Sequence, residues 1–192
     1  MRICVYGAAS FSIDQEYIDR VEELGREMAK RGHSLVFGGG ANGLMGAAAR
    51  GIKEESGYVL GVIPSFFDDE KIEGVFENCD KLIETKTMRE RKQIMEDNAD
   101  AFIVTPGGVG TFEEFFEILT SKQLCRHNKP IAVFNVNDYY KELSVMMEAS
   151  VDKKFVRPNC LALYKVTDSL EELFGYLEGP HPIRTVKDLK EG

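Results

Sequence analysis

The chain has 192 residues, 43% of them hydrophobic, which is enough to bury a sizeable core within the usual size range of one domain. Its 32 acidic and 24 basic residues give a formal charge of −8, which argues against binding to long nucleic acids, because that requires neutralising many phosphates. Every apolar run is shorter than the ~20 residues of a membrane span, and the opening MRICVYGAAS resembles a strand more than a signal peptide. We therefore expect a cytoplasmic protein with no membrane or nucleic-acid partner.

In chain order, short apolar runs alternate with longer segments of helical periodicity. The runs predict strands at 2–6, 34–37, 58–63, 81–85, 101–105, 131–135 and 161–166. The intervening segments predict helices near 15–31, 43–55, 88–99, 111–126, 138–152 and 168–177. Strands that are apolar throughout and separated by helices form parallel sheets covered on both faces. We predict an α/β fold, a three-layer Rossmann-like arrangement with a mostly parallel sheet of about seven strands.

One domain is expected to span residues 1–192, since no repeat or linker interrupts the chain. Segment 64–80 lacks clean periodicity and is predicted as a loop or flap, and 178–192 as a peripheral tail. Helical spacing assigns two apolar stripes to the core: Tyr17, Ile18, Val21, Leu24 and Met28 in one helix, and Phe112, Phe115, Phe116 and Leu119 in another. The scattered cysteines and histidines form no CxxC pair or other metal-ligand spacing, so no metal is predicted.

A first glycine loop lies in SLVFGGGANGLMGAAARG, residues 34–51. Gly38, Gly40 and Gly43 satisfy GxGxxG, which raises a dinucleotide site. The motif follows the second strand instead of the first, and the next strand ends in Pro64 and Ser65, with no acidic residue to hold a ribose. Tight turn geometry with close helix packing explains the small residues equally well. Both interpretations stay open at this point.

A second glycine loop, TPGGVGT at 105–111, repeats this architecture at the end of another strand. Glycines let backbone N–H groups converge on an oxygen-rich ligand, and the following helix adds its positive end. Both loops are expected at the carboxyl edge of the sheet, where ligands bind in open α/β folds. Glu113 and Glu114 come directly after this anion-binding pattern, which they should oppose. A structural alternative is that Thr111 and Glu114 form a T-x-x-E capping box.

The segment KTMRERKQIMED, residues 86–97, opens a predicted helix with several cations. The helix dipole is already positive there, so each exposed cation costs ~0.3–1 kcal/mol. A broken local rule is a pointer to function. The alternative is a solvated basic face, partly neutralised by Glu90 and Glu96.

Together, GGGANGLMG, the MRERK helix start and PGGVGTFEE resemble the LONELY GUY family of cytokinin riboside 5′-monophosphate phosphoribohydrolases, often mislabelled as lysine decarboxylases. The resemblance runs from ICVYGAAS to about residue 175. It implies a nucleotide-binding domain that hydrolyses the N-glycosidic bond of a purine nucleoside 5′-monophosphate, AMP or N6-prenylated AMP, to free base and ribose 5-phosphate. It also implies no cofactor and a homodimer with active sites near the subunit interface. Lysine decarboxylation would need a pyridoxal phosphate lysine, which nothing here marks.

Carried across, the resemblance makes Arg91 and Glu114 the catalytic pair. The substrate-binding residues that it implies are Met88, Lys92, Gly107, Gly108, Val109, Gly110, Thr111, Glu113, Thr120, Gly39 and Gly40. Departures from the family pattern bear on base specificity: Arg89 stands where many members have histidine, Val109 where tyrosine is common, and Phe112 where leucine is common.

This assignment resolves the conflict between glycine loop and carboxylates. The loop would face the 5′-phosphate, while Glu114 would point along the ligand to the ribose, where positive charge develops as the base leaves. Arg91 stays protonated at neutral pH and is expected to clamp the nucleotide and balance Glu114. Glu113 is assigned to substrate binding or to support of the site.

Two other functions compete. One is a nucleotide-binding or sensing module without hydrolysis, and a weaker one is an NAD(P)-dependent oxidoreductase based on GGGANG. The residues leave open which base is preferred, whether the role is hormone production or salvage, and whether the assembly is a dimer or larger.

Overall fold

The computed structural model describes residues 1–69 and 74–182. Its described part contains seven strands in one sheet, ordered β4-β3-β2-β1-β5-β6-β7. Their bounds are β1 (Arg2–Tyr6), β2 (Ser34–Phe37), β3 (Val59–Pro64), β4 (Lys81–Thr85), β5 (Ala101–Val104), β6 (Ile131–Phe134) and β7 (Lys165–Thr167). Every neighbouring pair is parallel, which confirms the predicted α/β, Rossmann-like architecture.

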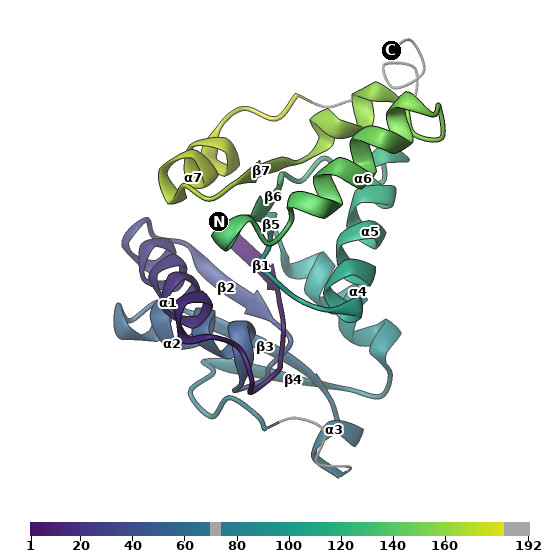
Figure 1. Ribbon diagram of the computed structural model, residues 1–192. Helices are drawn as coiled ribbons and strands as arrows, with labels where there is room; N and C mark the ends of the chain where they lie inside the picture. Colours follow the sequence, from purple (N-terminus) through teal and green to yellow (C-terminus); the bar gives the residue numbers. More distant parts are fainter. Residues whose placement is uncertain (70–73, 183–192) are drawn as a thin grey trace.

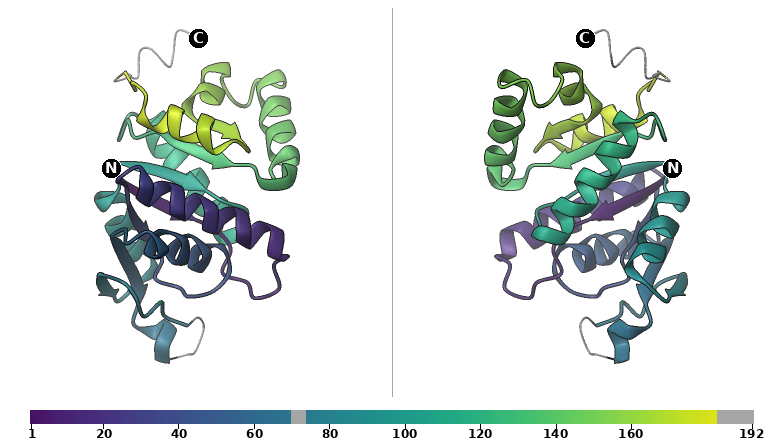
Figure 2. Two further views of the ribbon diagram at one scale, coloured as in Figure 1. Left: turned by 90° about the vertical axis from the view of Figure 1, so that its left-hand side faces the viewer. Right: turned by 90° about the vertical axis from the view of Figure 1, so that its right-hand side faces the viewer.

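Helices cover both faces of the sheet (Figures 1 and 2). One face packs against α1 (Gln15–Lys30), α2 (Gly43–Glu54) and α7 (Leu170–Glu178). The other packs against α4 (Met88–Asn98), α5 (Val109–Gln123) and α6 (Lys141–Asp152). Successive β1 residues alternate between the two cores, with Ile3 on the first side and Cys4 on the second, as the pleat requires. A single turn, α3 (Phe66–Asp69), follows β3.

The two predicted apolar stripes face the core. In α1, Val21, Leu24 and Met28 are fully buried, and Tyr17 and Ile18 pack partly buried beside them. The stripe of α5 is arranged in the same way: Phe115 and Leu119 are buried, and Phe112 and Phe116 are partly buried against the second core.

The last strand, predicted at 161–166, is present but begins later than predicted. Residues Pro158–Leu163 form a 3-10 helix, and the strand β7 begins only at Lys165. Cys160 and Leu163, three positions apart, are both buried, which fits the three-residue turn of a 3-10 helix. Pro158 at its start has the fixed φ that helix entry favours. The apolar run 161–166 is too short for its periodicity to distinguish a strand from a helix, so the sequence alone could not determine its secondary structure.

Three other segments differ at their ends or lie partly outside the described residues. The helix predicted at 138–152 begins at Lys141, after a short 3-10 turn, Val136–Asp138, in which Asn137 and Asp138 have left-handed φ values of 51° and 58°. The predicted flap, 64–80, contains α3 and an isolated bridge between Gly40 and Val75, but 70–73 are not described. Of the predicted tail, residues 183–192 also lie outside the described part.

Close packing of α1 on α2 explains much of the small-residue composition after the first glycine loop. A Cβ on Gly25 would overlap the Ala48 carbonyl, and one on Gly51 would overlap the Glu22 carbonyl. The helices therefore approach each other at backbone distance, and larger side chains would push them apart. The structural interpretation of GLMGAAARG is confirmed.

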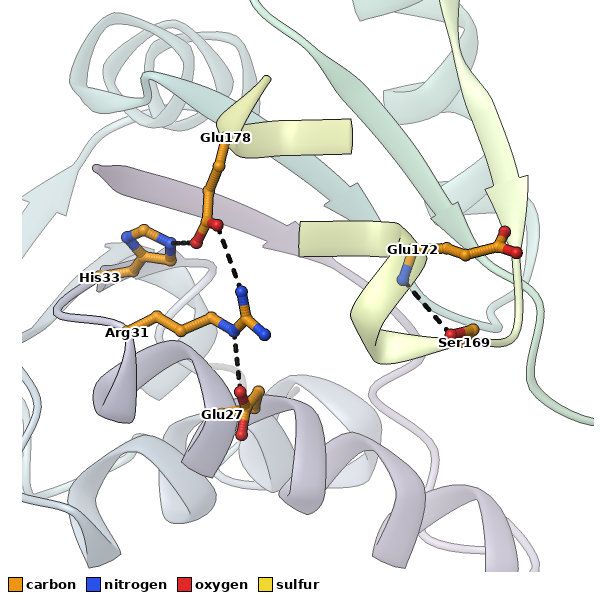
Figure 3. A network of polar contacts seen from close by, with 6 residues as sticks. All are labelled: Glu27, Arg31, His33, Ser169, Glu172 and Glu178. Atoms are coloured by element: carbon orange, nitrogen blue, oxygen red, sulfur yellow. Dashed lines mark hydrogen bonds and ion pairs between the residues drawn. The ribbon is translucent and has the colours of Figure 1, made fainter. Parts of the chain in front are cut away.

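Polar contacts tie α7 to the end of α1 (Figure 3). The Ser169 hydroxyl caps the helix by accepting the Glu172 N–H at 3.3 Å. At its other end, Glu178 lies 2.9 Å from His33 Nε2 and accepts from Arg31, whose Nε donates to Glu27. His33 directly precedes β2, so this network lies at the amino edge of the sheet, away from both glycine loops.

The strand order places a topological switch beside β1. From β1 the chain moves outward through β2 and β3 to β4, and then returns to add β5 on the other side of β1. Ligands bind at the carboxyl ends of strands at such a point. Residues 7–11 after β1 and the glycine loop after β5 meet there. Within the described residues, no helix combines the length and apolar character needed to cross a membrane.

Candidate functional site

A cavity of about 450 Å³ opens at this switch point. It is lined by Gly7, Ala8, Ala9, Ser10, Phe11, Met45, Phe67, Met88, Arg91, Lys92, Gly108, Gly110, Thr111, Glu113 and Glu114. The loop after β1, the first turn of α5 and the first turns of α4 supply most of them, and α4 and α5 lie on the same face of the sheet (Figure 1). Arg91 and Glu114, predicted as a pair, therefore share one cavity.

The glycine turn before α5 presents free amide groups. The carbonyls of Thr105, Pro106 and Gly107 accept hydrogen bonds from the Tyr140 hydroxyl (2.7 Å), the Ala8 N–H (3.1 Å) and the Tyr139 hydroxyl (2.6 Å). In a trans peptide the N–H points opposite to the C=O, so the following amides turn away from these partners. Among the described residues, the N–H groups of 107–111 have no acceptor.

This arrangement is suited to an oxyanion. The unpaired N–H groups belong to the glycine turn and the first turn of α5, where the helix dipole also favours negative charge. A Cβ on Gly107 would overlap the Thr111 hydroxyl, so only glycine allows that close approach. The turn can hold a phosphate through main-chain groups alone.

The capping box predicted for Thr111 and Glu114 is wrong. α5 begins at Val109 with Gly108 as N-cap, so Thr111 already lies inside the helix. The glycine turn, with Gly108 in an extended conformation, starts the helix earlier than the side-chain pattern suggests. Side-chain capping occurs instead at α4, where Thr87 accepts the Glu90 N–H at 3.1 Å and Glu90 accepts the Lys86 N–H at 2.9 Å.

Arg91 is the most enclosed cation of the site, with 4% of its surface exposed. Its Nε donates to the Val62 carbonyl at 3.1 Å and its Nη2 to the Gly38 carbonyl at 2.9 Å. The guanidinium also lies over the Phe67 ring, 5.4 Å from its centroid. Within the described residues no carboxylate forms an ion pair with it. A positive charge is thus fixed beside the cavity and remains available to a ligand.

Glu114 is partly buried and lacks any hydrogen-bond or ion-pair partner in the described part of the chain. Burial raises the pKa of its carboxyl to about 7, the charge of Arg91 opposes that rise, and Glu113 adds to it. A carboxyl that titrates near neutral pH and faces a cavity can accept or donate a proton there.

Lys92 joins α4 to α5. Its Nζ lies 2.5 Å from Glu113 and 2.6 Å from Glu117. Burial opposes the charge of Lys92, but the two carboxylates outweigh it and raise the pKa of its ammonium group. Glu113 is therefore paired at the rim of the cavity, whereas Glu114, its neighbour in sequence, is not.

Five predicted binding residues lie outside the cavity lining: Gly39, Gly40, Gly107, Val109 and Thr120. Gly39 and Gly40 pair with the segment 74–76, through the Phe76 N–H to Gly39 carbonyl bond of 2.8 Å and the bridge to Val75. Val109 is 84% exposed, and Thr120 is exposed further along α5. Gly107 lines a neighbouring hollow of about 300 Å³ behind the turn, together with Tyr139.

Sequence reasoning missed the loop at 7–11, Met45, Phe67 and Tyr139. The loop had a usable signal, since it follows the first strand of a parallel sheet and so had to lie at the carboxyl edge. Phe67 lies in the segment without periodicity, and nothing in NVNDYY indicates that a tyrosine reaches the glycine turn.

Comparison with known proteins places these motifs in a family. The family described as "Possible lysine decarboxylase" matches residues 45–177. The chain is 36% identical over 182 residues to cytokinin riboside 5′-monophosphate phosphoribohydrolase LOG5 of Arabidopsis thaliana, covering 95% of this chain and 79% of the relative. It is 35% identical over 181 residues to the probable enzyme LOGL2 of Oryza sativa subsp. japonica, covering 94% and 73%.

Solved structures share the fold at lower identity. The Moco carrier protein of Chlamydomonas reinhardtii superposes with a TM-score of 0.68 at 21% identity, covering 92% of this chain and 94% of that one. A molybdenum cofactor binding protein of Rippkaea orientalis gives 0.66 at 20% identity, covering 92% and 93%. These likenesses concern the fold alone, whereas the family match and the relatives above 30% identity extend over most of the sequence. This chain belongs to the LOG family, whose members are also described as possible lysine decarboxylases.

Proposed function

We propose that this chain is an enzyme that hydrolyses the N-glycosidic bond of a purine nucleoside 5′-monophosphate, AMP or an N6-prenylated AMP, to free base and ribose 5-phosphate. The main support for this proposal is that one cavity combines free amides at the start of α5 with the buried Arg91 and the unpartnered Glu114. Similar relatives are named for this reaction on cytokinin riboside 5′-monophosphates.

In the proposed complex the 5′-phosphate binds the amides of the glycine turn. Binding energy at the phosphate then fixes the ribose against the reacting groups, although the phosphate itself does not react. Arg91 adds a fixed positive charge that holds the nucleotide and keeps Glu114 ionised more readily. Apart from an Nη1 contact of 3.9 Å with Met88 Sδ, its N–H groups that are not bound to Val62 and Gly38 can contact the ligand.

In the proposed reaction the bond between the ribose anomeric carbon and the base nitrogen breaks, and its electron pair leaves with the base. A water oxygen forms the new bond to that carbon, and Glu114 takes the proton of the water. The ionised carboxylate also stabilises the cationic, oxocarbenium-like transition state. The departing base is protonated from solvent. Because the pKa of Glu114 is about 7, the required carboxylate form is well populated at neutral pH.

The proposal is tested by supplying the purified protein with AMP, isopentenyl-AMP, GMP and CMP and measuring ribose 5-phosphate and free base. We expect turnover of the adenine nucleotides and the least with CMP. A mock preparation from cells that lack the protein serves as the control for contaminating activity. Nucleotide binding without product over hours would instead identify a binding or sensing module, and product from none of the four would reject the proposed substrates.

We also propose a homodimer with the cavity near the subunit contact. Met88 at the cavity and Val109 at the start of α5 are 40% and 84% exposed, so both apolar side chains are accessible to a second subunit. Light scattering at micromolar concentration measures the mass, and a monomer would contradict this arrangement.

Tyr139→Phe is predicted to weaken nucleotide binding. The lost hydroxyl donates to the Gly107 carbonyl at 2.6 Å and so helps to aim the next amide at the phosphate. One neutral hydrogen bond is worth about 0.5–1.5 kcal/mol, so KM should rise about 2–10-fold with a smaller change in kcat. Tyr17→Phe is the matched control, because Tyr17 packs edge-on against Tyr139 at 6.3 Å and its hydroxyl has no partner among the described residues. Equal KM values for both variants would contradict a role for the Tyr139 hydroxyl.

A further inference from the structure

The first glycine loop, Gly38–Ala41, is hydrogen-bonded to the segment 74–76 of the same chain. The Ala41 N–H donates to the Gly74 carbonyl at 2.7 Å, and the Gly39 carbonyl accepts the Phe76 N–H at 2.8 Å. Gly40 pairs with Val75. The Ala41 amide is therefore already used, and residues 38–41 do not line the cavity, so the GGGANG motif calls for another explanation.

We infer that Gly38 is a positioning residue for Arg91: its missing side chain makes room for the guanidinium, and its carbonyl holds it. A Cβ at Gly38 would overlap Arg91 Nη2, at a distance of 1.8 Å, and it would lie 3.2 Å from Met45 Sδ. The Gly38 carbonyl accepts from that same Nη2 at 2.9 Å. This inference deepens the proposed function, on which its catalytic consequences depend.

Backbone conformation does not require glycine at this position. Gly39 and Gly43 have left-handed φ values of 78° and 57°, which only glycine adopts at low cost, but Gly38 has no such value. Space for the arginine is therefore the reason for glycine at position 38. The four glycines of GGGANG thus differ: Gly39 and Gly43 have left-handed φ values, Gly40 pairs with Val75, and Gly38 contacts Arg91.

The carbonyls of Gly38 and Val62, here called the seat of Arg91, hold its guanidinium from two neighbouring strands. Gly38 follows β2 and Val62 belongs to β3, so the two carbonyls that accept its N–H groups lie at the carboxyl edge of adjacent parallel strands. The planar guanidinium needs both acceptors at once, and this sets its orientation. Phe67 covers it at 5.4 Å. A displaced Gly38 would therefore reorient the Arg91 guanidinium and change its electrostatic effect on Glu114.

A double-mutant cycle tests the seat without any assay of activity. Gly38→Ala should lower the melting temperature of the wild-type chain, because the new Cβ overlaps Arg91 Nη2 and the guanidinium must leave the Gly38 and Val62 carbonyls to make room. In the Arg91→Ala background the overlapping atoms are gone, so the same substitution should cost much less. Gly25→Ala is the matched control: its Cβ overlaps the Ala48 carbonyl, far from Arg91, and should cost the same in both backgrounds. Equal costs of Gly38→Ala in both backgrounds would overturn the inference.

The catalytic readout uses the pH profile. Gly38→Ala should lower kcat about 10²-fold, the order expected for a displaced catalytic group. It should also move the acidic limb of the kcat/KM profile to higher pH, because Arg91 then lowers the pKa of Glu114 less. Gly25→Ala should leave that limb in place. If Gly38→Ala is active and the acidic limb of its pH profile does not move, the inference is overturned. If no variant hydrolyses the nucleotides but the costs of Gly38→Ala still differ between the two backgrounds, the proposed function is rejected and the role of Gly38 in holding Arg91 stands.

Discussion

Glu114→Gln is expected to reduce kcat about 10³-fold with little change in KM, since general-base and electrostatic contributions of one group each reach about 10²–10⁴-fold. Glutamine keeps the size of the side chain but can neither take a proton from water nor carry a negative charge. Steady-state release of ribose 5-phosphate from AMP measures the loss. The matched control is Glu117→Gln, because Glu117 lies one turn further along α5, is paired with Lys92 and does not line the cavity.

The same substitution should show the raised pKa of Glu114 in the stability of the fold. Burial raises that pKa from 4.5 to about 7, so the folded chain binds the proton more tightly than the unfolded chain. The wild-type protein should therefore lose stability relative to Glu114→Gln as pH rises from 4.5 to 7, with a constant difference above that. The difference is of the order of 1–3 kcal/mol, reduced by the partial exposure of the side chain.

Urea unfolding of both proteins at several pH values measures this difference, and kcat/KM over the same range gives the second readout. Activity should rise with pH through about 7 as the carboxylate forms. Activity that falls over this range would make Glu114 a general acid instead. A Glu114→Gln protein with near wild-type turnover would remove it from the chemistry altogether.

Arg91→Ala is expected to lower kcat/KM about 10²–10³-fold, the range found when one preorganised donor to a reacting site is removed. Two effects add. The ligand loses a fixed cation, and Glu114 loses the charge that lowers its pKa, so the acidic limb of the pH profile moves above its wild-type position. The carbonyls of Gly38 and Val62 also lose their donor, and this should lower the melting temperature.

Arg91→Lys separates charge from geometry. An ammonium keeps the positive charge but cannot span two carbonyls as a planar guanidinium does, so partial activity is expected. Arg89→Ala is the control on the same helix, since Arg89 is exposed and does not line the cavity. Full activity of Arg91→Lys would show that charge alone is needed, and full activity of Arg91→Ala would exclude Arg91 from the reaction.

Local sequence patterns were sufficient to predict most of the fold. Strands such as Arg2–Tyr6 and Ala101–Val104 are apolar runs bounded by glycine or helix signals, and the parallel sheet follows from their alternation with amphipathic helices. The α1 and α5 stripes were predictable because helical period depends on residues within a few turns. The start of the strand predicted at 161–166 was wrong because six residues are too few to reveal a period, and the 3-10 helix found there packs against α5 and α6.

The motifs indicated which residues to examine, but tertiary contacts decided what each one does. MRERK and PGGVGTFEE singled out Arg91 and Glu114 from sequence. Their shared cavity, the enclosure of Arg91 by two strand ends and the pKa of about 7 at Glu114 arise from packing between α4, α5, β2 and β3. The two glycine loops have similar sequences, yet the amides of 107–111 are free, whereas the loop 38–41 is hydrogen-bonded to the segment 74–76. Hydrogen bonding and burial depend on neighbours far away in the chain, and for that reason only the folded structure could distinguish a glycine turn with free amides from one that contacts an arginine.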